Sequence, residues 1–277
     1  MGSPFNLALV QTNSGNQVAP NVTIVSEMIR EARSGGADLV MLPETVSLME
    51  TRSKLVFEQV RSQDEDEALK AFSGLADELG IWLHTGSLPI RLSDTKIANR
   101  SFLLDPSGAI KATYDKIHMF DVDLPGGETY RESKNYQPGE RAVLADLPWG
   151  KLGLTICYDL RFPHLYRHLG QAGADFLCVP AAFTKVTGEA HWHILLRARA
   201  IETGCFVFAP AQTGTHAGER KTFGHALIVN PWGEVLADAG LEPGVILAKI
   251  DGAEVAKARA KIPALKLDAA YSPVARG

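Results

Sequence analysis

The sequence predicts an α/β layered fold, because short apolar runs alternate with longer helical patterns along most of the chain. The run Phe5–Gln11 is short and apolar, as expected of a buried strand. The next segment, Val18–Arg33, carries apolar residues at helical spacing and ends in Gly35-Gly36, a helix stop signal. Hairpin patterns also occur along the chain. The alternation and the hairpins together favour sheets that are buried between helices.

The first half of the chain contains four further strand patterns and one further helix. The strands are predicted at Asp38–Leu42, Ile81–Ser87, Asn99–Leu104 and Ala109–Tyr114. The last two form a hairpin around the turn Asp105-Pro106-Ser107-Gly108. The helix is predicted at Glu65–Glu78 and is closed by Gly80. Residues 115–140 are polar and rich in glycine and proline, and a loop this long inside a compact domain is usually functional or disordered.

The second half resumes the alternation with an apolar strand that ends at Cys157. Helices are predicted at Pro163–Ala172, Glu189–Thr203 and Gly252–Lys261. Strands are predicted at Asp175–Pro180, Cys205–Ala209, Ala226–Val229, Val235–Ala237 and Val245–Ile250. The tail after Ile262 has weak periodicity, so we expect it to be loose or to be ordered only by packing on a partner subunit.

Length and composition predict one domain. The 277 residues are 45% hydrophobic and 22% charged, which is ordinary for a globular protein. A chain of this length can bury a large core without disulfide bonds or structural metals. Because no linker, low-complexity tract or repeat interrupts it, we expect residues 1–277 to form a single domain, with a core at 5–262 and a tail at 263–277.

The net charge and the cysteine content limit the binding partners and the cellular compartment that we expect for this chain. The net charge is −4 and no dense Lys/Arg run occurs, so nucleic acid is not expected as a partner. No apolar stretch reaches the roughly 20 residues of a membrane span and the N-terminus lacks a signal-peptide pattern, so we expect a soluble, cytoplasmic protein without a membrane partner. Three cysteines, Cys157, Cys178 and Cys205, are too few and too widely spaced for a disulfide framework or a zinc site, which fits a reducing compartment.

Cys157 lies at the most informative position in the chain. It ends an apolar strand and precedes a polar turn and a helix, in the run Thr155-Ile156-Cys157-Tyr158-Asp159. A thiol on such a turn points into a cleft, near backbone N–H groups and a helix N-terminus, as a nucleophile requires. The alternative is that Cys157 is a small buried hydrophobic residue, as most free cysteines are.

Glu44 and Lys116 also follow predicted strands. In layered α/β folds the strand ends on one edge converge on a crevice. A thiol needs a base and a positive neighbour to react as a thiolate, so Glu44 can accept its proton while Lys116 supplies the charge and later faces an oxyanion. The alternative is that both residues are surface groups or members of salt bridges.

Three segments of the chain resemble the signature blocks of the nitrilase (carbon–nitrogen hydrolase) superfamily. They are Leu42-Pro43-Glu44, Tyr114–Asp121 and Gly153–Pro163, and they occur in the order that the family shows. Shorter matches extend the resemblance over residues 5–265, nearly the whole chain, and include Arg131-Glu132-Ser133, Pro180–Phe183, Arg197–Glu202 and Asn230–Glu234. Within the superfamily the chain is most similar to deaminated-glutathione amidases and ω-amidases.

The resemblance implies a four-layer αββα sandwich that pairs into a homodimer or a higher homo-oligomer. It also implies a catalytic set of Glu44, Lys116 and Cys157, with a second glutamate at Glu132 in the polar loop. From this set we expect a thioester on Cys157 and an oxyanion held by the Lys116 ammonium and the backbone N–H of Tyr158. No metal and no other cofactor is expected, because Lys116 polarises the carbonyl.

Three further residues are candidates for binding the substrate. Arg161, four residues after the nucleophile, has the planar fork that grips a carboxylate, or it forms a structural salt bridge with Asp159 or Glu44. Phe183 and Thr184 follow a strand end and are expected to line the acyl pocket, unless they simply pack.

His191 and His193 raise the question of a metal site. Residues two apart on a helix point to different faces, so this pair does not predict one. The sequence therefore gives no metal ligands.

The leading hypothesis is an amidase that hydrolyses a small carboxylate-bearing ω-amide to acid and ammonia. The resemblance makes deaminated glutathione and 2-oxoglutaramate the candidate substrates. A nitrilase or an N-carbamoyl amino acid hydrolase would use the same Glu-Lys-Cys set, and pocket shape alone separates these activities. A non-catalytic binding protein on the same fold is the third hypothesis, and it predicts that a member of the set is missing, whereas all are present.

Overall fold

A computed structural model describes residues 3–124 and 127–270, so residues 271–277 of the predicted tail lie outside the described part. Seven strands form the first sheet, in the order β17-β1-β2-β3-β5-β4, with β6 paired to β5. Their bounds are β1 Phe5–Gln11, β2 Leu39–Met41, β3 Trp82–His84, β4 Leu88–Arg91, β5 Ile97–Leu104, β6 Ile110–Asp115 and β17 Gly244–Ile250. The pairs β1–β2 and β2–β3 are parallel, and the other pairs in this sheet are antiparallel.

Six strands form the second sheet, in the order β16-β15-β12-β11-β10-β9. Their bounds are β9 Val143–Leu147, β10 Gly150–Leu154, β11 Phe176–Cys178, β12 Phe206–Ala209, β15 Leu227–Val229 and β16 Val235–Asp238. Its central pairs, β10–β11 and β11–β12, are again parallel. Two small antiparallel pairs join β7 (Asp121–Asp123) to β8 (Thr129–Arg131) and β13 (Thr213–Thr215) to β14 (Lys221–Phe223).

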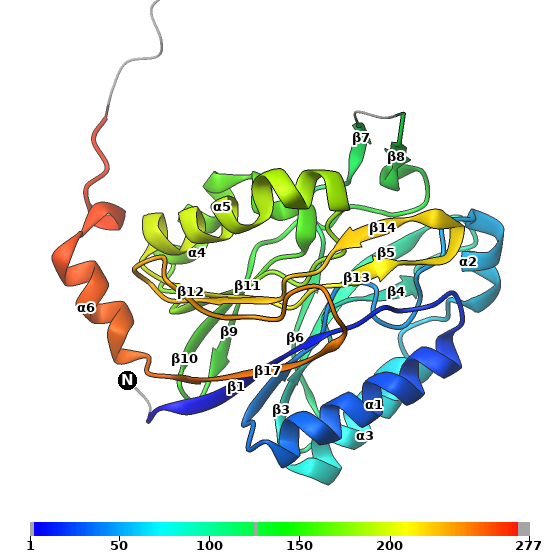
Figure 1. Cartoon of the computed structure of the whole chain (residues 1–277), viewed down its shortest axis with the longest axis horizontal. Helices are drawn as coiled ribbons and strands as arrows, with labels where there is room; N and C mark the ends of the chain where they lie inside the picture. Colours follow the sequence, from blue (N-terminus) through cyan, green and yellow to red (C-terminus); the bar gives the residue numbers. More distant parts are fainter. Residues whose placement is uncertain (1–2, 125–126, 271–277) are drawn as a thin grey trace, which may run out of the picture.

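Helices cover the outer face of each sheet, which gives the four layers visible in Figure 1. The helices α1 (Val18–Ser34) and α3 (Glu67–Leu79) lie on the first sheet, and α4 (Pro163–Gln171) and α5 (Lys185–Thr203) lie on the second. The shorter helices are α2 (Ser53–Gln59) and α6 (Ala253–Lys261), and the 3₁₀ turns are η1 (Glu132–Lys134), η2 (Cys157–Arg161), η3 (Ala217–Glu219) and η4 (Ala264–Lys266). The predicted αββα class is confirmed. Within the described residues, none of the helices combines the length and apolar character that a bilayer crossing requires.

The side chains of β1 show why both faces of its sheet are covered. Because successive residues of a strand point to opposite faces, Phe5, Leu7 and Leu9 enter the core between the two sheets. Ala8 and Val10 enter the separate core beneath α1 and α3. The nearly continuous apolar run of β1 therefore reflects a strand buried on both sides.

Most predicted elements are present, with shifted ends. The strand predicted at Ile81–Ser87 ends at His84 because the chain turns at Gly86 (φ +66°), where a Cβ would lie only 1.9 Å from the carbonyl oxygen of Pro43. The helix predicted to begin at Glu189 begins at Lys185 instead. The polar loop predicted at 115–140 contains the β7–β8 pair and η1. The elements α2, β4, β9, β13 and β14 were not expected.

A buried histidine in β3 predicts a pH effect on stability. His84 Nδ1 accepts the Gly86 N–H at 3.2 Å, and burial lowers the pKa of His84 to about 3. The unfolded chain binds a proton near pH 6.5 that the folded chain does not, so stability is lost as the pH falls from about 6.5 towards 3. We expect this residue to account for about 2 kcal/mol of the fall in unfolding free energy between pH 7 and pH 5.

Urea denaturation of wild type and His84→Asn at both pH values measures this contribution. Asn retains an acceptor for the Gly86 N–H but does not titrate, so the variant should show the smaller fall. An equal fall in both proteins would contradict the assignment.

Candidate active site

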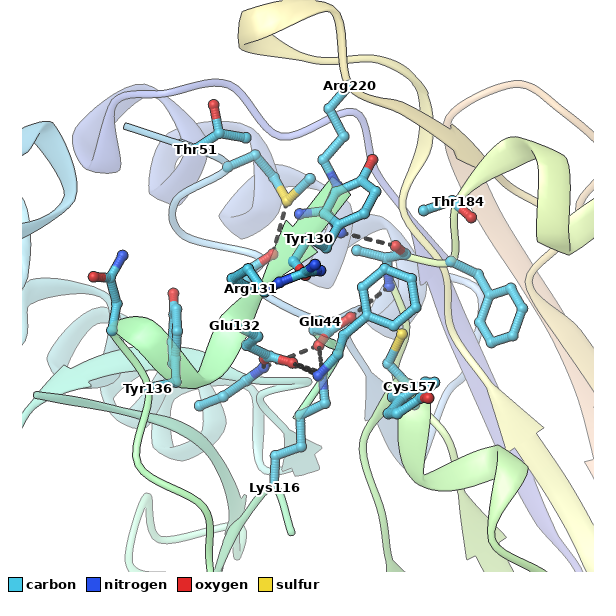
Figure 2. A pocket seen from close by; sticks show the side chains of 18 of the residues that line it. Glu44, Thr51, Lys116, Tyr130, Arg131, Glu132, Tyr136, Cys157, Thr184 and Arg220 are labelled. Atoms are coloured by element: carbon cyan, nitrogen blue, oxygen red, sulfur yellow. Dashed lines mark hydrogen bonds and ion pairs between the residues drawn. The ribbon is translucent and has the colours of Figure 1, made fainter. Parts of the chain in front are cut away.

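A buried ammonium group lies between two carboxylates (Figure 2). Lys116 Nζ donates to Glu44 Oε1 at 3.0 Å and to both carboxylate oxygens of Glu132, at 3.0 and 2.9 Å. The side chains of Lys116 and Glu44 are 2% and 5% exposed. Because water is largely excluded, each group stabilises the charged form of its neighbours.

Glu44 follows β2 by three residues and is held by groups from both sheets. Its Oε1 accepts from Asn99 Nδ2 of β5 at 2.9 Å, and its Oε2 accepts from the backbone N–H of Ala182, after β11, at 2.8 Å. Its backbone carbonyl accepts from Nε2 of the buried Gln212 at 3.0 Å. The carboxylate therefore has a fixed orientation towards the cavity.

Cys157 begins the turn η2, three residues after β10. Its backbone lies in the left-handed region (φ +48°), which costs a non-glycine residue on the order of 1–2 kcal/mol. The Cys157 N–H donates to the carbonyl of Pro180 at 3.0 Å, and the thiol lines the cavity beside Glu44. The N–H of Tyr158 lies in the first turn of η2 and has no intrahelical acceptor, so it is available to an oxyanion.

Asp159 connects the turn of the thiol to the segment that carries Lys116. This fully buried carboxylate accepts from the Tyr114 hydroxyl at 2.7 Å, from the Ile156 N–H at 2.9 Å and from the His118 N–H at 3.0 Å. Tyr114 and His118 flank Lys116 in sequence, and Ile156 precedes Cys157. One buried polar cluster thus joins the segment that carries the ammonium group to the segment that carries the thiol.

Electrostatics favours a neutral thiol beside an ionised carboxylate. Burial raises the pKa of Glu44, but Lys116 and hydrogen bonding outweigh it, so the pKa lies below its usual value. Burial raises the pKa of Cys157, and the neighbouring Glu44 charge raises it further, to well above that of a free thiol. Burial lowers the pKa of Lys116, but Glu132 and Glu44 overcome this and hold it well above the ordinary value. In the resting site Cys157 is therefore a neutral thiol, Glu44 is an ionised carboxylate and Lys116 is a charged ammonium group.

The predicted site residues, with one exception, line a single cavity of about 260 Å³. Glu44, Lys116, Glu132, Cys157, Tyr158, Phe183 and Thr184 all contribute to its wall. Arg161 does not line it. The Arg161 guanidinium instead covers the Phe183 ring at 5.0 Å, and Arg161 Nη1 lies 3.3 Å from His191 Nδ1. Arg161 fails as a pocket residue because its side chain leaves the turn towards α5, and it pairs with neither Asp159 nor Glu44 within the described residues.

Arg220 lines the cavity and was missed by the sequence analysis (Figure 2). Its Nη2 donates to the carbonyl of Ala182 at 3.0 Å, and its guanidinium lies 5.6 Å from the centre of the Tyr130 ring. Its buried Nε finds no acceptor among the described residues. Arg131 also lines the cavity, but its guanidinium is bound to both carboxylate oxygens of Asp123. No local pattern around Glu219-Arg220-Lys221 distinguishes this arginine from a surface charge.

A family model, curated relatives and a solved structure each match most of this chain. A family model described as carbon–nitrogen hydrolase matches residues 6–260. A deaminated glutathione amidase of Yersinia enterocolitica is 42% identical over 94% of this chain and 92% of its own. Omega-amidase NIT2 of Homo sapiens is 36% identical over 95% of this chain and 94% of its own. The crystal structure of the C. elegans NitFhit protein superposes with a TM-score of 0.89 at 34% identity, covering 96% of this chain and 65% of that one.

The charge state of the site predicts how Cys157 reacts with an alkylating agent. Because Glu44 is ionised and takes the thiol proton directly, iodoacetamide should inactivate the enzyme at a nearly constant rate between pH 6 and pH 9. A free thiol would instead react faster by about tenfold per pH unit below its pKa near 8.5. Glu44→Gln should slow the reaction across the whole range.

Inactivation rates measured against pH, with the modified cysteine identified by mass spectrometry, test this expectation. A sigmoidal rise with a midpoint near pH 8.5 in the wild type would show that Cys157 titrates as an ordinary thiol.

Proposed function

The chain belongs to the carbon–nitrogen hydrolase family, and we propose that it hydrolyses a small carboxylate-bearing ω-amide to acid and ammonia through a thioester on Cys157. Hydrolysis of an amide C–N bond follows from the family and from the amidase relatives. The roles of individual residues and the substrate class are the proposed part. The observation that supports them is that a thiol, a base, an ammonium group and an incompletely bonded arginine line the same cavity.

The proposed reaction begins when Glu44 accepts the Cys157 proton as the sulfur attacks the amide carbonyl. The Lys116 ammonium and the N–H of Tyr158 stabilise the oxyanion. Glu44 then gives the proton to the leaving nitrogen, ammonia departs, and the acyl group remains on sulfur. Water attacks the thioester after losing its proton to Glu44, which returns the proton to the sulfur as the acid leaves.

Glu132 has a positioning role in this proposal. Its carboxylate accepts two hydrogen bonds from Lys116 Nζ and one from the Phe120 N–H at 2.6 Å. It therefore fixes the ammonium where the oxyanion forms and balances its charge between turnovers. Phe183 and Thr184 line the acyl side of the cavity.

Arg220 is the group that we propose binds the substrate carboxylate, in place of Arg161. Its Nε has no acceptor among the described residues, and a carboxylate in the cavity would supply one. Arg131 is less suited because Asp123 already neutralises it. Both candidate substrates carry a carboxylate away from the scissile amide. 2-Oxoglutaramate has a primary amide and would release ammonia, whereas deaminated glutathione has a secondary amide and would release an amine by the same steps.

We also propose a homodimer that forms through α5, in a reducing, cytoplasmic compartment, with residues 1–277 of each chain forming a single hydrolase domain whose core spans 5–262. Support for the dimer comes from Val186, Ile194 and Ile201, which expose apolar side chains on α5, Ile194 to 69%. Support for the compartment comes from three cysteines that are all free and buried.

Sedimentation of the purified chain tests the assembly. The wild type should have twice the 30.0 kDa mass of one chain, and Ile194→Glu should be a monomer because a buried, unpaired charge weakens the interface. A monomeric wild type, or a dimer that is unchanged by Ile194→Glu, would contradict it.

Ammonia release from a panel of amide, nitrile and carbamoyl forms of one dicarboxylic acid tests the reaction. The amide should be the preferred form, and Cys157→Ala should release no ammonia from it. Undiminished turnover by Cys157→Ala would refute the nucleophile, and preference for the nitrile or carbamoyl form would refute the amidase assignment.

The same panel tests the carboxylate contact with a neutral amide of equal chain length. Arg220→Gln should lower kcat/KM for the carboxylate-bearing amide by about 10- to 100-fold, because a charge-assisted hydrogen bond is lost, and should leave the neutral amide nearly unaffected. Arg131→Gln is the matched control, since it removes the other arginine of the cavity wall. A larger loss in Arg131→Gln than in Arg220→Gln would assign the contact to Arg131.

A further inference from the structure

A second cluster of functional side chains lies outside the cavity wall, between α5 and the β15–β16 hairpin. His193 Nε2 is 3.1 Å from Asp238 Oδ2, and His225 Nδ1 is 2.9 Å from Asp238 Oδ1. The potential ligand atoms of the three residues all lie within 4.8 Å of one another. The proposed hydrolysis uses none of these groups.

We propose that His193, His225 and Asp238 bind one Zn²⁺ ion. Two imidazole nitrogens and one carboxylate oxygen are ligands that zinc prefers, and three protein ligands leave a fourth tetrahedral position for water. With metal–ligand distances of about 2.0–2.2 Å, neighbouring ligands in a tetrahedral site lie roughly 3.3–3.5 Å apart. The spacing seen here needs only small side-chain adjustments to reach that value.

The ligands are held in place before any ion binds. The His225 backbone adopts the left-handed conformation (φ +56°), fixed by its N–H donating to Gly240 O and by Trp192 Nε1 donating to its carbonyl, both at 2.8 Å. The His225 ring stacks on Phe223 with the ring centres 4.5 Å apart. Asp238 Oδ1 accepts from the Gly240 N–H at 2.8 Å. Outer contacts of this kind orient metal ligands and raise affinity.

The tautomers of the two imidazoles also permit binding. Neutral His193 can carry its proton on Nδ1 and neutral His225 on Nε2, which frees the nitrogens that face Asp238. The side chains of His193 and Asp238 are 36% and 33% exposed, so the ion can enter from solvent.

The chain provides a matched control on the same helix. His191 is two residues before His193 but contacts Arg161, so His191→Ala removes an imidazole from the same helix without removing a proposed ligand. The prediction that His191 and His193 point to different faces is met, and the partners of His193 come instead from residues 32 and 45 positions later.

Equilibrium dialysis of the metal-free full chain against Zn²⁺ at pH 7.5, with metal quantified by mass spectrometry, tests the proposal. We expect one ion per chain in the wild type, in His191→Ala and in Cys157→Ala. His193→Ala and Asp238→Asn should bind at least tenfold more weakly, because each variant lacks one ligand. Co²⁺ in place of Zn²⁺ should give the visible absorption bands of a tetrahedral site in the wild type and not in Asp238→Asn.

Amide hydrolysis measured without added metal shows whether the His191, His193 and Asp238 variants are folded, because none of these residues lines the cavity. Absence of a stoichiometric ion in an active wild type would overturn the proposal and leave a hydrogen-bonded His–Asp–His cluster. Equal binding by wild type and Asp238→Asn, or loss of the ion in Cys157→Ala alone, would assign the metal to another site. Since hydrolysis is the folding control, failure of the proposed function would appear as an inactive wild type with its zinc still bound.

Discussion

The charge balance around Lys116 constrains much of the structure. One ammonium group shares two carboxylates in a region from which water is largely excluded, and removing that ammonium group would leave uncompensated buried carboxylates at a cost of about 3–5 kcal/mol. Two negative charges around one positive charge also give the cluster a net negative charge. Burial and the nearby Glu44 charge together suppress ionisation of the thiol until a substrate carbonyl can accept the sulfur's electrons.

The two-sheet architecture brings these side chains together from distant parts of the chain. Glu44 follows a parallel strand of the first sheet, Cys157 follows a parallel strand of the second, and Lys116 follows an antiparallel edge strand. Buried polar residues join the pieces: Asp159 links the thiol turn to the lysine segment, and Gln212 reaches the backbone of Glu44. These buried hydrogen bonds join the segments just after the strands, where Glu44, Lys116 and Cys157 lie.

Sequence reasoning succeeded where apolar residues recur at a regular spacing, or where the chemistry of a position admits only a few residue types. Alternation and helix stop signals located β1, α1 and α3, and strand ends together with family resemblance drew attention to Glu44, Lys116 and Cys157. Arg161 does not line the cavity, because proximity to Cys157 in sequence does not fix the direction of a side chain on a 3₁₀ turn. Arg220 and the partners of His193 were not found, because only the packing of separate loops brings them to their neighbours. The start of α5 was missed because Val186, Thr187 and Gly188 are weak helix formers whose helical state depends on tertiary contacts.

The central claim is that acid, ammonium and sulfur act together on one acyl group carried by Cys157. Acid quenching of the wild-type enzyme during turnover, followed by peptide mapping, tests it directly. The account predicts that the Cys157 peptide gains the mass of the substrate minus ammonia, and that no other peptide is labelled. An unmodified Cys157 peptide under conditions where a thioester survives, or an acyl group on another residue, would contradict it.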